Sequence, residues 1–229
     1  MKTIGLLGGM SWESTALYYK IINEQVKQRL GGLHSAKIVL YSVDFHEIER
    51  LQASGEWDKA GVLLAAAARS LECAGADFIV LCTNTMHKVA GQISDAVDIS
   101  LLHIADATAA RIKAAGIQKV GLLATRFTME QTFYKARLEH YGIEVLVPAE
   151  QERQNVHNII YNELCQGIIR EKSRALYRQV ISRLADAGAE AIILGCTEIT
   201  LLVQENDCSV PLFDTTFIHA EDAVIRSLS

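Results

Sequence analysis

The sequence predicts an α/β protein built from two similar half-domains, each with helices on both faces of a mostly parallel sheet, a three-layer α/β/α arrangement. Three observations predict this fold. Short apolar segments alternate with longer amphipathic ones, a segment of the first half matches one of the second, and only two prolines interrupt the 229 residues. We expect residues 1–100 and 210–229 to form the N-terminal half-domain and residues 101–209 the C-terminal one.

The expected strands are short runs that are almost entirely apolar, as is typical of parallel strands covered on both faces. In the first half of the chain they are residues 3–7, 38–43, 78–82 and 101–104. In the second half they are residues 120–123, 145–147, 191–194 and 212–213.

The segments between these runs carry apolar residues at helical spacing. Residues 60–74 bring Leu63, Leu64, Ala67 and Leu71 to one face. Residues 177–187 do the same with Val180, Ile181 and Leu184. One apolar face on each segment predicts helices that pack on the sheets.

The chain carries an internal duplication. Residues 77–85 read Asp-Phe-Ile-Val-Leu-Cys-Thr-Asn-Thr and align without a gap with residues 190–198, Glu-Ala-Ile-Ile-Leu-Gly-Cys-Thr-Glu. Residues 3–8 resemble residues 119–124 at nearly the same offset. The period is longer than that of solenoids or propellers and indicates a duplicated half-domain. The alignment places Thr83 opposite Cys196.

Composition excludes several classes of function. The net charge of −5 is spread along the chain without a basic stripe, so we expect no nucleic-acid partner. No apolar run reaches the length of a membrane span, and a strand begins at the N-terminus, so we expect a cytoplasmic protein without a membrane partner. Five cysteines without a CxxC pair and seven histidines without ligand spacing predict neither a disulfide framework nor a metal site.

Polar turns follow four of the expected strands, at residues 8–11, 83–85, 125–128 and 196–198. Ligands of open α/β sheets bind at the carboxyl ends of the strands, so these turns should line a cleft between the half-domains. Gly8 and Gly9, with Ser11 as a helix cap, would expose backbone amides that suit a carboxylate. A tight strand-to-helix turn explains the same glycines equally well. They form neither a GxGxxG nor a Walker pattern.

Cys196 is the residue that we expect to carry the chemistry. It follows a strand and precedes an expected helix, whose amides would lower the thiol pKa and favour the thiolate, a base able to abstract a proton. Cys82 should point to the opposite face from Thr83 and pack beneath the cleft, because neighbouring strand residues alternate. The other cysteines, Cys73, Cys165 and Cys208, are expected to be inert.

Three motifs together resemble the aspartate/glutamate racemase family of cofactor-independent amino-acid racemases. They are Ile-Gly-Leu-Leu-Gly-Gly-Met-Ser at residues 4–11, Leu-Cys-Thr-Asn-Thr-Met-His at 81–87 and Gly-Cys-Thr-Glu at 195–198. The resemblance covers essentially the whole chain. It implies an amino-acid substrate bound between two pseudo-symmetric domains, one acid/base residue from each half, no pyridoxal phosphate, and often pairing of the chain into a homodimer.

The sequence departs from this family at one position. Most such racemases have cysteines at both facing positions, whereas Thr83 stands at the first. A threonine hydroxyl is too weak an acid to serve as a base without an activator, although it can relay a proton from water. The resemblance therefore implies that Cys196 removes the α-proton from one enantiomer, the L form by the family pattern. Thr83, or a water it holds, would then reprotonate the carbanion.

The resemblance and the strand-end positions together predict the substrate contacts. We expect them at Met10, Ser11, Gln52, Asn84, Thr85, Thr125 and Thr197. Acid-specific members of the family place cationic residues where this chain has Glu49 and Cys165, which opens the substrate range from aspartate and glutamate to a broader or neutral set. Gln52 is equally well explained as a solvated loop residue. His87 is better explained as capping its own helix than as orienting the cleft.

Two other functions stay open at this point. Relatives with a single thiol at the second-half position include decarboxylases, so a single-cysteine decarboxylase of malonate-type acids is the nearest enzymatic alternative. The Asn84-Thr85 pair favours the racemase. A catalytically silent amino-acid-binding protein is the other alternative, and an unreactive Cys196 would support it.

Overall fold

The computed structural model describes all residues from Met1 to Ser229. It divides into two units that each contain one sheet. Unit 1 comprises Met1–Ile104 and His219–Ser229, and unit 2 comprises Ala105–Ile218. This division differs from the expected boundaries at residues 101–104 and 210–218. The reason for the second difference is that the last strand, residues Leu212–Asp214, pairs in register with a strand of unit 2.

Unit 1 holds a four-stranded parallel sheet in the order β2-β1-β3-β4. The strands are β1 (Ile4–Gly8), β2 (Ile38–Ser42), β3 (Phe78–Leu81) and β4 (Ser100–Leu102). The helices of unit 1 are α1 (Trp12–Leu30), α2 (Phe45–Ala53), α3 (Trp57–Cys73), the 3₁₀ helix η1 (Thr85–Val89), α4 (Ala90–Ser94) and most of α11 (Thr215–Leu228).

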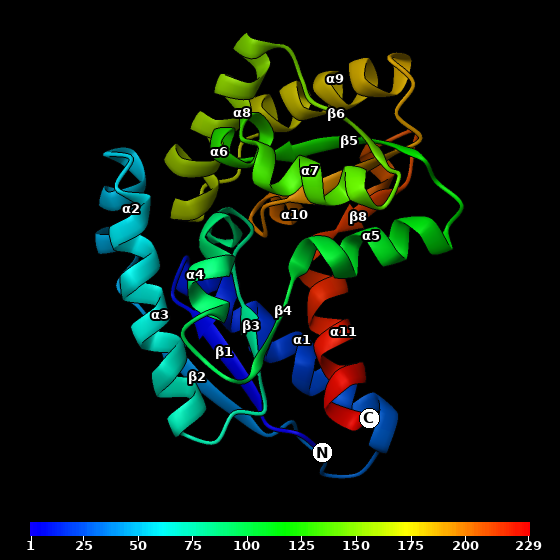
Figure 1. Ribbon diagram of the computed structural model, residues 1–229. Coiled ribbons are helices and arrows are strands. Elements are labelled where there is room, and N and C mark those ends of the chain that lie inside the picture. Colours follow the sequence, from blue (N-terminus) through cyan, green and yellow to red (C-terminus); the bar gives the residue numbers. More distant parts are fainter. The chain divides into compact units, whose positions relative to one another are not determined.

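Alternation along the strands of unit 1 divides its core between two faces of the sheet. Ile79 and Leu81 of β3 pack in one apolar cluster with residues of α2 and α3. Phe78 and Val80 pack in the other cluster, with α1 and α11. Figure 1 shows the same layering, with α3 on one side of the sheet and with α1 and α11 side by side on the other. The expected helical face of residues 60–74 is confirmed in α3, where Leu64, Ala67 and Leu71 are buried.

Unit 2 repeats this architecture. Its four-stranded parallel sheet has the order β6-β5-β7-β8, so each strand takes the place of the strand four earlier in the chain. The strands are β5 (Lys119–Ala124), β6 (Glu144–Leu146), β7 (Ala191–Gly195) and β8 (Leu212–Asp214). The helices are α5 (Ile104–Ala114), α6 (Arg126–Glu130), α7 (Thr132–His140), α8 (Glu150–Asn162), η2 (Leu164–Gln166), α9 (Glu171–Asp186), α10 (Ile199–Leu202) and η3 (Glu205–Asp207).

The repeated sheet confirms the α/β class, the parallel strands and the duplication predicted from the sequence. In α9 the expected face is buried through Val180, Ile181 and Leu184. It lies so close to β5 that a Cβ added at Gly121 would be 3.0 Å from Leu184 Cδ1. One expected strand end is wrong: Ile104 begins α5 and does not continue β4.

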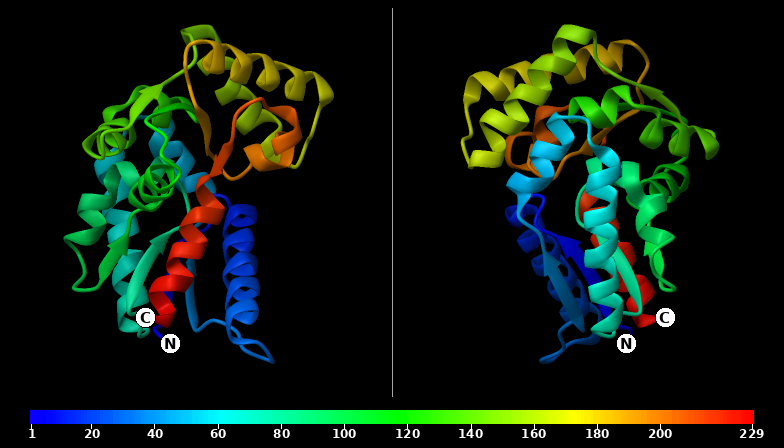
Figure 2. Two further views of the ribbon diagram at one scale, coloured as in Figure 1. Left: turned by 90° about the vertical axis from the view of Figure 1, so that its right-hand side faces the viewer. Right: turned by 60° about the vertical axis from the view of Figure 1, so that its left-hand side comes forward.

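The chain begins and ends in unit 1. Lys2 donates a backbone hydrogen bond to the Ser227 carbonyl at 2.8 Å, and Figure 2 shows both ends of the chain at the same end of this unit. No helix combines the length and the hydropathy that a membrane-spanning segment requires.

Candidate active site

The turn after β1 is shaped by glycine and closed by hydroxyl groups. Gly9 has φ +94°, and a Cβ at this position would overlap the backbone of Val43. The Gly9 amide donates to Thr15 Oγ1 at 2.8 Å. This amide was expected to be exposed to a carboxylate, and it is instead hydrogen-bonded within the protein. Ser11 caps α1 by accepting from the Ser14 amide at 3.2 Å, which confirms the expected cap. The peptide bond between Met10 and Ser11 is cis.

The turn after β3 contains Thr83, Asn84 and Thr85. Thr83 is half-buried, and Asn84 and Thr85 are buried. The Thr83 amide donates to the Leu81 carbonyl at 2.8 Å, which bends the chain sharply away from the strand. The His87 amide then donates to the Asn84 carbonyl at 3.1 Å and starts η1.

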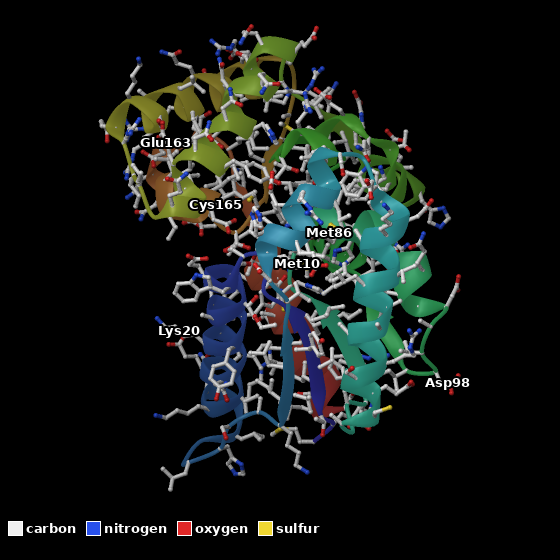
Figure 3. All side chains as sticks on the ribbon, turned by 90° about the vertical axis from the view of Figure 1, so that its left-hand side faces the viewer. Met10, Lys20, Met86, Asp98, Glu163 and Cys165 are labelled. Carbon is white, nitrogen blue, oxygen red and sulfur yellow. The ribbon has the colours of Figure 1, made fainter.

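Gln52 lies in α2 and is 3 % exposed, so its interpretation as a solvated loop residue is wrong. Its Nε2 donates to Met86 Sδ at 2.9 Å, which joins α2 to η1. Met86 belongs to the same apolar cluster as Met10 and Leu81. Figure 3 shows Met10 and Met86 near one another, at the end of unit 1 where β1 and β3 finish, with Asp98 at the other end. Met10 and Gln52 thus lie near the turn that carries Thr83.

In unit 2, threonine hydroxyls organise the corresponding turns. Thr125 follows β5 and caps α6, and its Oγ1 lies 3.3 Å from Thr128 Oγ1. Thr197 follows Cys196, and its Oγ1 lies 2.7 Å from Thr216 Oγ1 at the start of α11. Thr125, Thr128 and Thr197 lie in turns predicted at strand ends, whereas Thr216 does not, and Thr125 and Thr197 are both buried.

Cys196 and Glu198 form a hydrogen-bonded pair directly after β7. The Cys196 Sγ donates to Glu198 Oε2 at 2.9 Å. Cys196 is half-buried, and Glu198 is 7 % exposed. In this contact the thiol is the donor and a carboxylate oxygen is the acceptor.

The expectation of a lowered thiol pKa at Cys196 is therefore wrong. Burial raises the pKa of Cys196 well above its ordinary value, and the negative charge and hydrogen bond of Glu198 raise it further. The helix that follows, α10, has only four residues and begins three residues later, so it offers little dipole to oppose these effects. In this arrangement Cys196 is an acid, and the adjacent base is a carboxylate.

Two further groups of unit 2 belong to the electrostatic surroundings of Cys196. Burial raises the pKa of the Tyr177 hydroxyl, and the Cys196 and Cys165 thiols and the Glu163 carboxylate raise it further. Cys165 in η2 also raises the pKa of Cys196. Figure 3 shows Glu163 and Cys165 close together after α8. Position 165 therefore lies near the candidate catalytic thiol of its own unit.

Cys82 packs in the apolar cluster beneath α1 and α11, with no exposed surface, as the strand alternation predicts. Burial raises the pKa of its thiol far above the ordinary value. No group of three or more His, Cys, Asp and Glu side chains is arranged to hold a metal ion.

Each unit, taken by itself, brings its predicted residues to the carboxyl end of its sheet. Thr83 and Cys196 follow the equivalent strands β3 and β7, each of which pairs with the first strand of its unit. Glu198 is expected from the sequence only as part of a cleft-lining turn, and its hydrogen bond to Cys196 was not predicted, although the Cys-Thr-Glu spacing within one turn was a usable signal. It also missed Thr15 and Met86, whose contacts depend on tertiary packing.

A family model for Asp/Glu/hydantoin racemases matches residues 7–223. A crystal structure of a Yersinia pestis protein assigned as an Asp/Glu racemase is 62% identical, with a TM-score of 0.94 and full coverage of both chains. An aspartate racemase homologue from Pyrococcus horikoshii OT3 is 34% identical, with a TM-score of 0.87 and full coverage of both chains. A broad-specificity amino-acid racemase of Bacillus subtilis, RacX, is 25% identical over 99% of this chain and 98% of its own.

Proposed function

The chain belongs to the Asp/Glu/hydantoin racemase family and is an amino-acid racemase, and we propose that it works without a cofactor through proton transfers at Cys196 and Thr83. The observation that carries this proposal is the equivalence of the two positions. Thr83 and Cys196 follow matching strands in two sheets of the same order. Duplicated halves that each supply one proton carrier suit a reaction in which the α-carbon is deprotonated on one face and reprotonated on the other.

Cys196 and Glu198 act as the first proton-transfer pair. The Cys196 thiol passes its proton to the Glu198 carboxylate, and the resulting thiolate takes the α-proton of the substrate. The electron pair of the broken C–H bond is delocalised into the substrate carboxylate. This assignment is supported by the 2.9 Å hydrogen bond from Sγ to Oε2 and by the burial of Glu198.

Thr83, or a water that it holds, delivers a proton to the opposite face of the planar carbanion. Cys196 now carries the α-proton, Glu198 releases the proton it accepted to solvent, and the Thr83 hydroxyl or the water regains one from solvent, which restores the starting protonation state. In the reverse direction each group takes the opposite role. Both enantiomers form at equilibrium because they have equal free energy in water, so any asymmetry is confined to the kinetic constants.

The substrate is held by the polar turns at the carboxyl ends of the strands. Preorganised donors aimed at the carboxylate stabilise the charge that develops there as the α-proton leaves. We assign this binding role to Met10, Ser11, Gln52, Asn84, Thr85, Thr125 and Thr197. Two of these, Ser11 and Thr125, also cap helices, so their backbone segments are fixed before a substrate arrives.

The substrate range extends from aspartate and glutamate to a broader set of amino acids. Acid-specific relatives carry a cation where this chain has Cys165, and that position contributes to the electrostatics of Cys196. A thiol there provides no positive charge for a side-chain carboxylate. The full-length similarity to a broad-specificity racemase supports the same conclusion.

Proton NMR in heavy water tests the function directly. The protein is incubated separately with the L and D forms of aspartate, glutamate and several neutral amino acids. We expect loss of the α-proton signal, appearance of the other enantiomer, and loss of both effects in Cys196→Ser. Absence of exchange with every amino acid would overturn the racemase mechanism.

The variant Thr83→Val tests the second carrier, because valine keeps the shape of threonine and removes the hydroxyl. Cys196 would still exchange the α-proton of the L form and return deuterium to the same face. We therefore expect deuterated L substrate with little D product. Unchanged inversion in this variant would remove Thr83 from the mechanism.

A single-cysteine decarboxylase of malonate-type acids is the second candidate. The departure at Thr83 favours it, because a decarboxylase protonates its carbanion from one side only. Release of carbon dioxide from an α-substituted malonate, with no α-proton exchange in any amino acid, would select this activity. Binding of an amino acid without exchange or decarboxylation would instead identify a binding protein.

We also propose that the chain forms a homodimer, as the family resemblance implies. Light scattering coupled to size-exclusion chromatography tests this. A mass near 50 kDa, twice the 25.2 kDa of one chain, is expected, and a concentration-independent mass of one chain would exclude the dimer.

A further inference from the structure

A cluster of three histidines lies behind the turn that carries Thr83, and the racemase mechanism uses none of them. His87, His103 and His219 are all within unit 1, and their exposed fractions are 3 %, 7 % and 0 %. The ring of His87 lies 4.4 Å from that of His103 and 5.9 Å from that of His219, measured between centroids. Burying an imidazole costs free energy unless its ring nitrogens are hydrogen-bonded, so three buried rings this close together must each have partners.

Both ring nitrogens of His87 bind backbone groups. Nδ1 lies 2.7 Å from the Thr83 carbonyl oxygen, and Nε2 accepts a hydrogen bond from the Ile104 amide at 3.2 Å. A carbonyl oxygen only accepts and an amide only donates, so Nδ1 must carry the proton and Nε2 must not. The two contacts therefore select a single neutral tautomer.

His219 binds in the same manner on the other side of the cluster. Its Nε2 lies 3.0 Å from the Leu102 carbonyl oxygen and must donate to it, which leaves Nδ1 to accept from the Tyr18 hydroxyl at 2.9 Å. The two histidines thus hold both Leu102 and Ile104, the residues that end β4 and begin α5.

The cluster coincides with both places where the chain passes between its units. Ile104 is the last residue of the first segment of unit 1, and His219 is the first residue of the returning segment. His87 connects the first of these places to the carbonyl of Thr83 through one rigid ring. The backbone of the Thr83 turn and the start of α5 cannot shift independently while both bonds are made.

We propose that His87 is a positioning residue that fixes the Thr83 turn to the point where the chain leaves unit 1, and so orients Thr83 for proton transfer. The proposal rests on the role of Thr83 in the proposed function. It assigns His87 no contact with the substrate. We expect the α-proton exchange that is assigned to Cys196 to proceed without His87.

Two substitutions separate the two bonds of His87. In His87→Gln the longer side chain places its amide where Nε2 stood, so it can accept from Ile104 but loses the bond to Thr83. In His87→Asn the shorter amide stands where Nδ1 was, so it can donate to Thr83 but loses Ile104. His103→Gln is the matched control, because it changes the same cluster and leaves both contacts of His87 in place.

The kinetic readout compares inversion with simple exchange at the L α-carbon in heavy water. We expect His87→Gln to lower inversion about 10-fold to 100-fold while exchange through Cys196 falls less than about threefold. We expect His87→Asn, which breaks the link at Ile104, to lower the ratio of inversion to exchange as well, and His103→Gln to keep that ratio within about threefold of the unmodified protein. Equal loss of inversion and exchange in all three variants would identify a purely structural role and overturn the proposal.

A second readout does not depend on activity. Nitrogen NMR of the unmodified protein should show His87 protonated at Nδ1 and unprotonated at Nε2. Amide hydrogen exchange at Ile104 should become at least about 10-fold faster in His87→Asn and stay nearly unchanged in His87→Gln. If no amino acid exchanges its α-proton, the proposed function fails. In that case the nitrogen NMR and the amide exchange still test the hydrogen bond from Ile104 to His87, but the positioning role of His87 is overturned together with the proposed function.

Discussion

The hydrogen bond from Cys196 to Glu198 determines how reactive the Cys196 thiol is. Because Glu198 raises the pKa of the thiol through both its charge and its hydrogen bond, Glu198→Gln should lower that pKa. We expect iodoacetamide to alkylate Cys196 several-fold faster in this variant at pH 8, since the thiolate is the reacting form. Mass spectrometry of the Cys196 peptide measures the rate.

The exposed Cys73 provides the internal control, because its alkylation rate should be the same in both proteins. Buried Cys82 should stay unmodified in both. A slower or unchanged reaction at Cys196 would show that Glu198 does not raise the thiol pKa.

At the level of single residues, sequence reasoning located the polar turns and failed on their electrostatics. The position of Cys196 after β7 follows from the alternation of strands and helices and was predicted. The direction in which its pKa shifts depends on the Glu198 side chain, which folds back toward it, and on burial by distant segments. The interpretation of Gln52 as a solvated residue is wrong for the same reason, since its burial depends on the packing of α2 against η1.

The turn between β1 and α1 should tolerate no side chain at Gly9. Its φ of +94° is strained for other residues, and a Cβ would overlap the Val43 carbonyl oxygen. We expect Gly9→Ala to lower the free energy of unfolding by at least about 2 kcal/mol. Urea denaturation followed by circular dichroism measures this change.

Gly91 is the matched control for this substitution. It lies in α4, and a Cβ there would have nothing within 4 Å. Gly91→Ala should therefore be neutral or stabilise the protein by about 0.5–1 kcal/mol through helix propensity. Equal effects at both positions would contradict the steric explanation.

The histidine cluster should make the junction of β4, α1 and α11 sensitive to acid. Burial lowers the pKa of His219 to about 4, whereas the unfolded chain has the ordinary value of 6.5. The unfolded state therefore binds a proton at a higher pH than the folded state, and stability falls as the pH drops from 6.5 towards 4. At pH 5 the loss attributable to His219 should be about 2 kcal/mol.

Urea denaturation at pH 7.5 and pH 5 measures this loss. The groups that face His219 are the Tyr18 hydroxyl, the Leu102 carbonyl and the ring of His87. His219→Gln should be less stable at pH 7.5 but should lose about 2 kcal/mol less on acidification. His34→Gln, at an exposed position, should keep the pH dependence of the unmodified protein. An unchanged pH dependence in His219→Gln would contradict the assignment.

On the scale of the whole molecule, unit 1 depends on the last residues of the chain. Ala220, Ala223 and Val224 of α11 are buried against Tyr18, Ile22 and Phe78. A chain that stops after Ile218 would expose this apolar face, so we expect it to lose the protection of β1 and β3 in amide hydrogen exchange while β5 and β7 stay protected. Removal of Ser229 alone should change neither.

Sequence reasoning predicted the class, the parallel strands and the duplication of this fold, because the strands are continuous apolar runs and one of them occurs twice. The points where the chain passes between units were not predictable in the same way. The His103-Ile104 region reads as a strand, and only the register of β8 on β7 shows to which sheet the residues after Pro211 belong.

The discontinuity of unit 1 has a consequence for biosynthesis. A ribosome releases the chain from its N-terminus, so β1 to β4 emerge first but lack the residues of α11 that cover one face of their sheet. Residues Ala105–Ile218, which emerge next, contain all four strands of their own sheet. Unit 2 is thus complete before unit 1, whose sheet keeps one apolar face uncovered until the residues of α11 have emerged.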